Sequence, residues 1–74
     1  MIIYTPLWET LKKKKVSTYA LINKHRISSN TIQRIRRNMS MNTVTLNDLC
    51  RILDCEVGDV LCYVKDDENN EDDE

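Results

Sequence analysis

The residues from 29 to 37, SNTIQRIRR, have the length of one short helix but offer it very little to bury. At helical spacing only Ile32 and Ile35 form an apolar stripe, and the other side chains are hydroxyls, amides and arginines. A helix held by so narrow a stripe presents its polar side to a partner. Amide donors and acceptors beside arginines suit the edges of nucleic-acid bases and the phosphates around them.

This helix is expected to be the second of a closely spaced pair. Ser17 is placed to cap the helix before it, and Ser28 is placed to cap the helix itself. His25 to Ile27 form the turn between the two helices, with Ile27 directed back into the core. Asn38 stands where a helix commonly ends in a left-handed residue.

Two more helices flank this pair. The first is capped by Thr5, continues with Pro6 and runs to about Lys14. The other follows a loop, is capped by Thr45 and ends near Asp54. Apolar residues recur in both at the spacing of a buried helical face.

A short fifth helix is expected to start at Glu56. Beyond it, Tyr63 and Val64 form a β-prone patch that can pair with Ile2 to Tyr4. We therefore expect an all-α, compact five-helix domain over residues 1–65, with short β pairing of its termini. Its core should be built from apolar side chains at helical spacing, namely Leu7, Trp8, Leu11, Ala20, Leu21, Ile27, Ile32, Ile35, Leu46, Leu49, Cys50, Leu53, Val57, Val60 and Leu61.

The formal net charge of −1 conceals two oppositely charged parts. Residues 66–74, DDENNEDDE, hold seven of the twelve acidic residues and no base, so we expect a disordered acidic tail. Residues 1–65 hold eleven Lys or Arg against five Asp or Glu, a balance of +6. No acid stands between Ala20 and Asn47, whereas an ordinary surface mixes both signs. A folded region of this charge has affinity for polyanions.

Several other classes of protein are disfavoured. Seventy-four residues make one small domain, and no run approaches the roughly 20 apolar residues of a membrane span. The first residues lack the charged start and the length of a signal peptide, so we expect a cytoplasmic protein. Cys50, Cys55 and Cys62 match no common zinc spacing, so we expect buried thiols and no metal or cofactor. Without a catalytic arrangement of residues, the chain is not expected to be an enzyme.

The helix pair carries the pattern T-x-x-L, a turn, and then I-S-x-x-T-I-x-R-I. In this order the chain resembles the Cro and phage-repressor (XRE-type) helix-turn-helix family over about residues 5–63. It is especially similar to small stand-alone repressors that begin with a Y-x-P-L-W segment. The matching residues are Tyr4, Pro6, Leu7, Trp8, Thr18, Leu21, Ile27, Ser28, Thr31, Ile32, Arg34, Ile35, Leu46, Leu49, Leu53, Val57 and Leu61.

The resemblance implies that the third helix lies in the major groove of double-stranded DNA. It further implies which side chains touch bases and which touch the backbone. The residues that would face bases are Ser29, Asn30 and Gln33, with Arg34 at the groove wall or on a guanine. The residues that would bind phosphate are Ser17, Thr18, Tyr19, Arg37, Asn38 and Ser40.

One position departs from the family pattern. Where the turn usually has Gly, this chain has Arg26. Gly tolerates a positive φ at little cost, so Arg26 must either accept strain of about 1 kcal/mol or alter the turn. Its side chain could add a phosphate contact or simply lie in solvent.

Two functions fit these features. The first is a sequence-specific, DNA-binding transcriptional regulator, a repressor, acting as a homodimer at least on DNA through the fifth helix and the β-prone ends. The second is a protein-interaction module, an antitoxin or adaptor, in which the acidic tail binds a basic partner. The tail could also compete with phosphate for the basic face, or serve solubility alone.

Overall fold

Serine caps start the two central helices, as the sequence predicts. The Ser17 hydroxyl accepts a hydrogen bond from the backbone N–H of Ala20 at 3.0 Å, and the Ser28 hydroxyl accepts one from Thr31 at 3.2 Å. The computed structural model describes residues 1–65, so the predicted acidic tail lies outside the described residues. The elements in chain order are β1 (Ile2–Ile3), α1 (Thr5–Lys14), α2 (Thr18–Asn23), α3 (Ser29–Arg36), α4 (Thr43–Leu53), a 3-10 turn η1 (Val57–Asp59) and β2 (Cys62–Tyr63).

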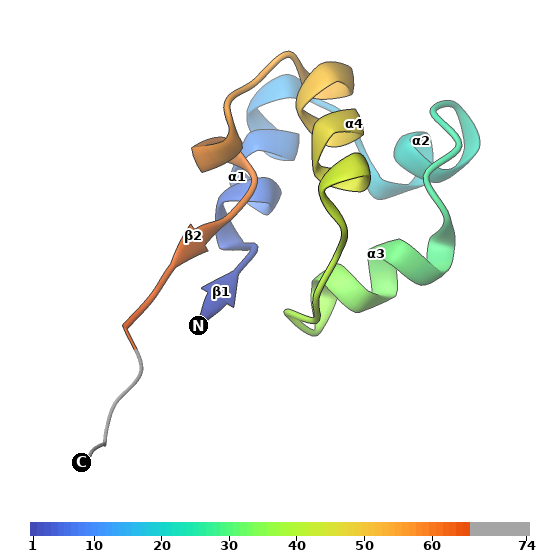
Figure 1. Ribbon diagram of the computed structural model, residues 1–74. Coiled ribbons are helices and arrows are strands. Elements are labelled where there is room, and N and C mark those ends of the chain that lie inside the picture. The colour runs from blue at the N-terminus through green and yellow to red at the C-terminus, as the bar shows by residue number, and fades with distance from the viewer. Residues whose placement is uncertain (66–74) are drawn as a thin grey trace, which may run out of the picture.

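The elements surround one aliphatic core. Helices α1 and α4 lie side by side, with η1 and the two strands on one side of them and α2 and α3 on the other (Figure 1). Every helix contributes to the core, and so does the segment after η1. The buried hydrophobic residues are Tyr4, Leu7, Leu11, Leu21, Ile27, Ile32, Ile35, Leu49, Leu53 and Val60. Trp8, predicted to be a core residue, is half-buried and packs against this cluster.

The predicted cap of the first helix is wrong. Helix α1 already includes Thr5, and the preceding residue, Tyr4, provides no side-chain cap. Tyr4 is 3% exposed, its N–H donates to Asn38 Oδ1 at 3.0 Å, and its hydroxyl donates to the Met39 carbonyl at 2.8 Å. These contacts fix where the chain enters the helix. They could not be predicted from local capping patterns, because their partners lie 34 and 35 residues away in the sequence.

The predicted cap of α4 is also wrong. Asn42 rather than Thr45 caps this helix, because the Asn42 side-chain oxygen accepts a hydrogen bond from the Thr45 N–H at 2.8 Å. The helix consequently starts at Thr43, inside the segment predicted to be a loop. It ends at Asp54 as predicted, in a left-handed conformation with φ of 50°.

The expected fifth α-helix is only the 3-10 turn η1, so the described chain has four α-helices. Glu56 starts this turn as predicted, and its N–H donates to the Asp59 carboxylate at 3.0 Å. Gly58 lies within the turn, and Gly disfavours a regular helix by about 1 kcal/mol relative to Ala. Only Val60 and Leu61 separate η1 from β2, which pairs with β1, so the chain has no room there for a longer helix.

The predicted pairing of the two ends is confirmed. Strands β1 and β2 are antiparallel, with Ile2 opposite Tyr63 and Ile3 opposite Cys62. The Val64 N–H extends the ladder by donating to the Met1 carbonyl at 2.8 Å. Within residues 1–65, no helix is long and apolar enough to cross a membrane.

Left-handed residues end three of the helices and form the central turn. Lys15, Asn38 and Asp54 have φ between 50° and 59°, and Asn38 takes this conformation as predicted. Arg26, where the resemblance implied a Gly, has φ of 65°. The turn therefore adopts the left-handed conformation that favours Gly, and Arg26 accepts the strain.

Replacing Arg26 by Gly should stabilise the protein. Removing the left-handed strain should raise the free energy of unfolding by about 1–2 kcal/mol. The greater freedom of Gly in the unfolded chain should lower it by about 0.5–1 kcal/mol. We expect the free energy of unfolding in urea to rise by roughly 0.5–1 kcal/mol. Arg26→Ala is the matched control, because it removes the same exposed side chain but keeps Cβ and the strain. Equal stability of the two variants would contradict this account.

Candidate nucleic-acid interface

Helix α3 buries one narrow face and exposes the rest. Ile32 is 1% exposed and Ile35 is fully buried, as predicted. Asn30, Gln33 and Arg37 are exposed on the opposite side, together with Ser29 on one flank. Asn30, Gln33 and Arg37 line a shallow hollow of about 340 Å³ along with Arg34 and Met39. Three predicted base-contacting residues and one predicted phosphate contact thus share one surface.

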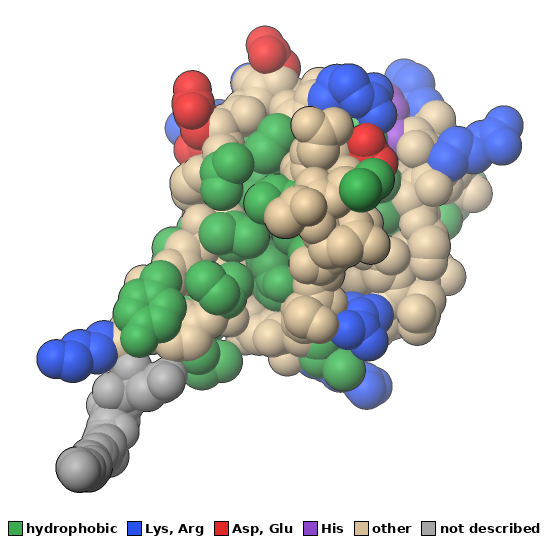
Figure 2. All heavy atoms as spheres, viewed as in Figure 1, with side chains coloured by type: hydrophobic (Ala, Val, Ile, Leu, Met, Phe, Trp, Pro, Cys, Tyr) green, Lys and Arg blue, Asp and Glu red, His purple; other side chains and the backbone are tan. Residues whose placement is uncertain are grey.

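Negative charge is excluded from this part of the molecule. All carboxylates of the described residues come from positions 9, 48, 54, 56 and 59, so α2, α3 and the loops that flank them contain none. The acidic side chains visible in Figure 2 lie over α4 and around η1, away from α3. Helix α1 adds Lys12, Lys13 and Lys14 in its last turn. The exposed side of α3 therefore lies in a positive field that no nearby carboxylate of residues 1–65 cancels.

Arg34 joins α3 to the loop that follows it. Its Nε and Nη2 donate to the Ser40 carbonyl at 3.2 and 3.0 Å, and Nη2 also donates to the Ser40 hydroxyl at 3.1 Å. The structure therefore brings together two of the predicted contact residues. An arginine has five N–H donors, so Arg34 can hold this loop and still offer donors to a ligand.

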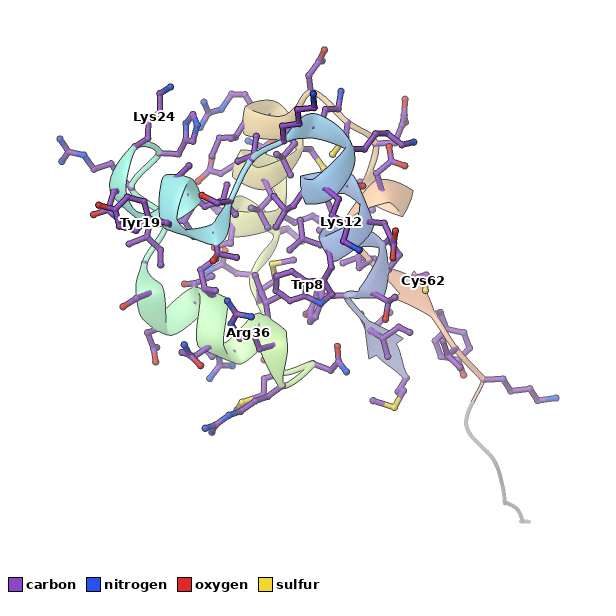
Figure 3. The ribbon with its side chains drawn as sticks, turned by 180° about the vertical axis from the view of Figure 1, so that it is seen from behind. Trp8, Lys12, Tyr19, Lys24, Arg36 and Cys62 are labelled. Carbon is purple, nitrogen blue, oxygen red and sulfur yellow. The ribbon has the colours of Figure 1, made fainter. Side chains whose placement is uncertain are left out.

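Arg36 occupies the other flank of α3. The sequence analysis did not include it among the predicted contact residues. Its guanidinium lies 5.4 Å from the centroid of the Trp8 ring, and its Nη2 donates to the Thr18 hydroxyl at 3.4 Å. Figure 3 shows Arg36 reaching from α3 toward Trp8 on α1. No local pattern could reveal this contact, because it joins residues from three separate helices.

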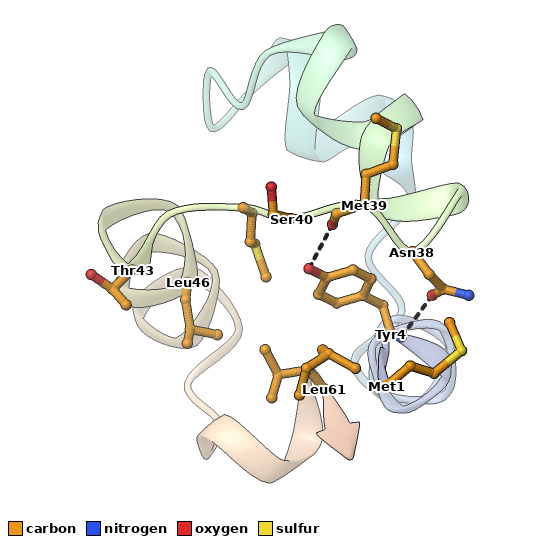
Figure 4. Close-up of a pocket in the computed structure, with 10 residues that line it drawn as sticks. Met1, Tyr4, Asn38, Met39, Ser40, Thr43, Leu46 and Leu61 are labelled. Atoms are coloured by element: carbon orange, nitrogen blue, oxygen red, sulfur yellow. Dashed lines mark hydrogen bonds between the residues drawn. The ribbon is translucent and has the colours of Figure 1, made fainter. Parts of the chain in front are cut away.

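Asn38 ties the end of α3 to the N-terminal segment. Its side-chain oxygen accepts the Tyr4 N–H, while the Tyr4 hydroxyl donates to Met39 (Figure 4). This leaves the amide nitrogen of the exposed Asn38 side chain to face outward. The loop that carries Asn38 and Ser40 is thus held by bonds at both ends.

The start of α2 presents the remaining predicted phosphate contacts. Ser17 is exposed and serves as the cap, Thr18 is half-buried beneath Arg36, and Tyr19 is 73% exposed. The first backbone N–H groups of any helix lack intrahelical acceptors, and in α2 the Ser17 hydroxyl satisfies that of Ala20. The Thr18 hydroxyl links this start of α2 to α3 through Arg36.

The three cysteines lie elsewhere. Cys50, Cys55 and Cys62 are free thiols and are half-buried. Burial and then the neighbouring Cys50 thiol raise the pKa of Cys55, which keeps it protonated and close to a small hydrophobe in behaviour. Among residues 1–65, no group of three or more His, Cys, Asp or Glu side chains is placed to hold a metal ion.

Comparisons with a protein-family model and with solved structures agree with this geometry. A search of curated protein sequences gave no match. The fold is similar to that in a crystal structure of the transcriptional regulator VanUg (Form II), with a TM-score of 0.80, 22% sequence identity, and coverage of 88% of this chain and 87% of that one. The sequence model of the Cro/C1-type HTH DNA-binding domain matches residues 6–66, most of the chain. With its α2–turn–α3 geometry, the protein therefore belongs to the Cro/C1-type helix-turn-helix family of DNA-binding domains.

Proposed function

We propose that this protein is a sequence-specific transcriptional regulator that reads the major groove of double-stranded DNA with α3. The observation that carries the proposal is the exposed side of α3, where amides and arginines border one hollow and acids are absent. Family membership supports DNA as the ligand. The similar fold of VanUg, itself a transcriptional regulator, is consistent with the same kind of role.

Base recognition is assigned to the first turns of α3. Asn30 and Gln33 can each bond an adenine in bidentate fashion, and Ser29 can bond either a donor or an acceptor. Arg34 keeps enough donors to reach a guanine or a phosphate at the groove wall while it holds Ser40. Each good bidentate pair contributes about 1–3 kcal/mol of discrimination.

Phosphate binding is assigned to the two ends of the helix pair. Ser17, Thr18 and Tyr19 would bind one strand through hydroxyls and the N–H groups at the start of α2. Arg37, Asn38 and Ser40 would bind phosphates beyond α3. Neutralising about four to six phosphates gives a slope of roughly −4 to −5 in a plot of log K against log salt concentration. Occupying an operator in this way excludes other proteins from it, which is the basis for proposing a repressor.

Two copies are proposed to bind together. One domain touches few base pairs, so useful affinity requires two half-sites about 34 Å apart. The surface proposed to join the copies lies around the paired termini and η1, where Ile2, Val57, Tyr63 and Val64 are 42–67% exposed. Figure 2 shows hydrophobic side chains gathered on this side of the molecule. An adjoining apolar pocket of about 410 Å³, between β1, the loop after α3 and α4, continues this surface (Figure 4).

The assignment of the reading edge can be tested by replacing both Asn30 and Gln33 with Ala. Selection from a random duplex pool would first provide the preferred sequence. Loss of two base contacts should reduce the ratio of operator to random-duplex affinity by about 2 kcal/mol or more, roughly 30-fold. Affinity for random duplex should change little, because it depends on phosphates. Asn47→Ala removes an exposed amide from α4 and should preserve the ratio; discrimination that survived in the double variant would refute the assignment.

The proposed dimer surface can be tested by truncating one exposed side chain inside it and one outside it. Tyr63→Ala should weaken self-association by about tenfold or more, as expected for an aromatic residue buried in an interface. Val44→Ala is the control, because Val44 is 68% exposed but lies on α4, outside both this surface and the proposed DNA contacts. Sedimentation equilibrium without DNA and with a two-half-site duplex would measure the change. Equal self-association of the two variants would exclude this surface.

A further inference from the structure

Arg36 is a cation held by neutral groups alone. Its guanidinium lies over the Trp8 ring, 5.4 Å from the ring centroid, and its one side-chain hydrogen bond within residues 1–65 goes to the Thr18 hydroxyl at 3.4 Å. Within residues 1–65 no carboxylate pairs with it. The bond to Thr18 is long for a hydrogen bond and uses one of five N–H donors. Among the described residues, most of the hydrogen-bonding capacity of Arg36 is therefore unused and its charge is not neutralised.

The surroundings keep this guanidinium in place and exposed. An indole face attracts a cation, and stacking on it leaves the in-plane N–H donors of an arginine free to bind. Lys12 follows Trp8 by one helical turn on α1, and Figure 3 shows Trp8, Lys12 and Arg36 on the same side of the molecule. A planar donor fork beside a hydroxyl, with a second cation on the same side of the molecule, is suited to an oxyanion with several oxygens.

We propose that Arg36, held on Trp8 and beside Thr18, forms a further binding site for a phosphate of the DNA backbone. The inference rests on the proposed function and extends it to a flank of α3 that faces α1 and α2. On the opposite flank, Arg34 binds Ser40 in the loop between α3 and α4. A helix in the major groove has a phosphate backbone on each side. Arg36 and Arg34 thus stand at the two edges of α3, where the two backbones would pass.

Trp8 is assigned a positioning role in this site. It does not touch DNA but restricts the rotamers of Arg36, so that less freedom is lost when the phosphate binds. As the chain's one tryptophan, it also reports on its neighbour. Binding of a phosphate by Arg36 should change Trp8 fluorescence as duplex is added.

The test compares Arg36→Gln with Arg51→Gln in the full chain. Both variants lose one arginine charge, but Arg51 lies on α4 beside Asp48. For Arg36→Gln we expect the slope of log K against log salt to fall in magnitude by about 0.9, with operator and random duplex weakened alike. The change in Trp8 fluorescence on binding should also shrink. Arg51→Gln should keep the wild-type slope, and Arg36→Lys should restore it because the charge returns.

The outcomes separate this inference from the proposed function. If the wild-type protein binds duplex DNA and the slope is unchanged in Arg36→Gln, the phosphate site is refuted while DNA binding stands. A change in the operator-to-random ratio without a change in slope would refute it too, because Arg36 would then contact a base. If the wild type showed no salt-dependent binding, the proposed function itself would fail. Circular dichroism would check folding, and Arg36→Met, whose stem can still pack on Trp8, would replace Arg36→Gln if that variant unfolded.

Discussion

The shape of the molecule depends on how an eight-residue helix with two buried side chains is held in place. Ile32 and Ile35 contribute about 1.5–3 kcal/mol each when fully buried, and a helix this short does not persist alone in water. Polar contacts from three directions therefore supplement the isoleucines. Asn38 binds Tyr4, Arg34 binds Ser40, and Arg36 binds Thr18 and stacks on Trp8. These contacts fix the orientation of α3 relative to α1, α2 and the following loop.

The same contacts divide the surface of α3 into supporting flanks and a free edge. Arg34 and Arg36 lie on opposite flanks and use some of their donors for support. Asn30, Gln33 and Arg37 lie between them, and within residues 1–65 their side chains form no hydrogen bond or ion pair. Because the carboxylates of residues 1–65 are confined to α1, α4 and the segment around η1, none of them competes with a ligand for this edge. Rigid support and an unneutralised edge are both needed to read bases against a background of phosphates.

Low sequence identity with VanUg alongside a similar fold has a physical explanation. The fold depends on apolar spacing, serine caps and left-handed helix ends, which many sequences can supply. Arg26 illustrates this tolerance. Its φ of 65° preserves the turn without Gly, and the neighbouring Ile27 still reaches the core at 8% exposure. The strain energy at Arg26 is small compared with the free energy gained by burying side chains such as Ile27, which this turn makes possible.

By itself the sequence determined the features that depend on nearest neighbours. The caps Ser17 and Ser28, the left-handed Asn38 and the burial of Ile32 and Ile35 could be predicted, because local hydrogen bonding and helical spacing dictate them. The pairing of the ends is a long-range contact, and only the β-prone composition of the two segments indicated it. The exposed amides of the reading edge followed from the same helical spacing. Their roles toward DNA remain proposals.

Only the tertiary structure decided which of several local options was used. Asn42 rather than Thr45 became the cap of α4, through a local bond that the sequence offered as one of several options. Tyr4 set the start of α1, because its hydrogen bonds to the distant Asn38 and Met39 fixed the chain there. The contacts of Arg36 could not be predicted for the same reason. A long, flexible side chain chooses its partner by the distance between helices, and Trp8 becomes its neighbour only when α1 and α3 pack on one core.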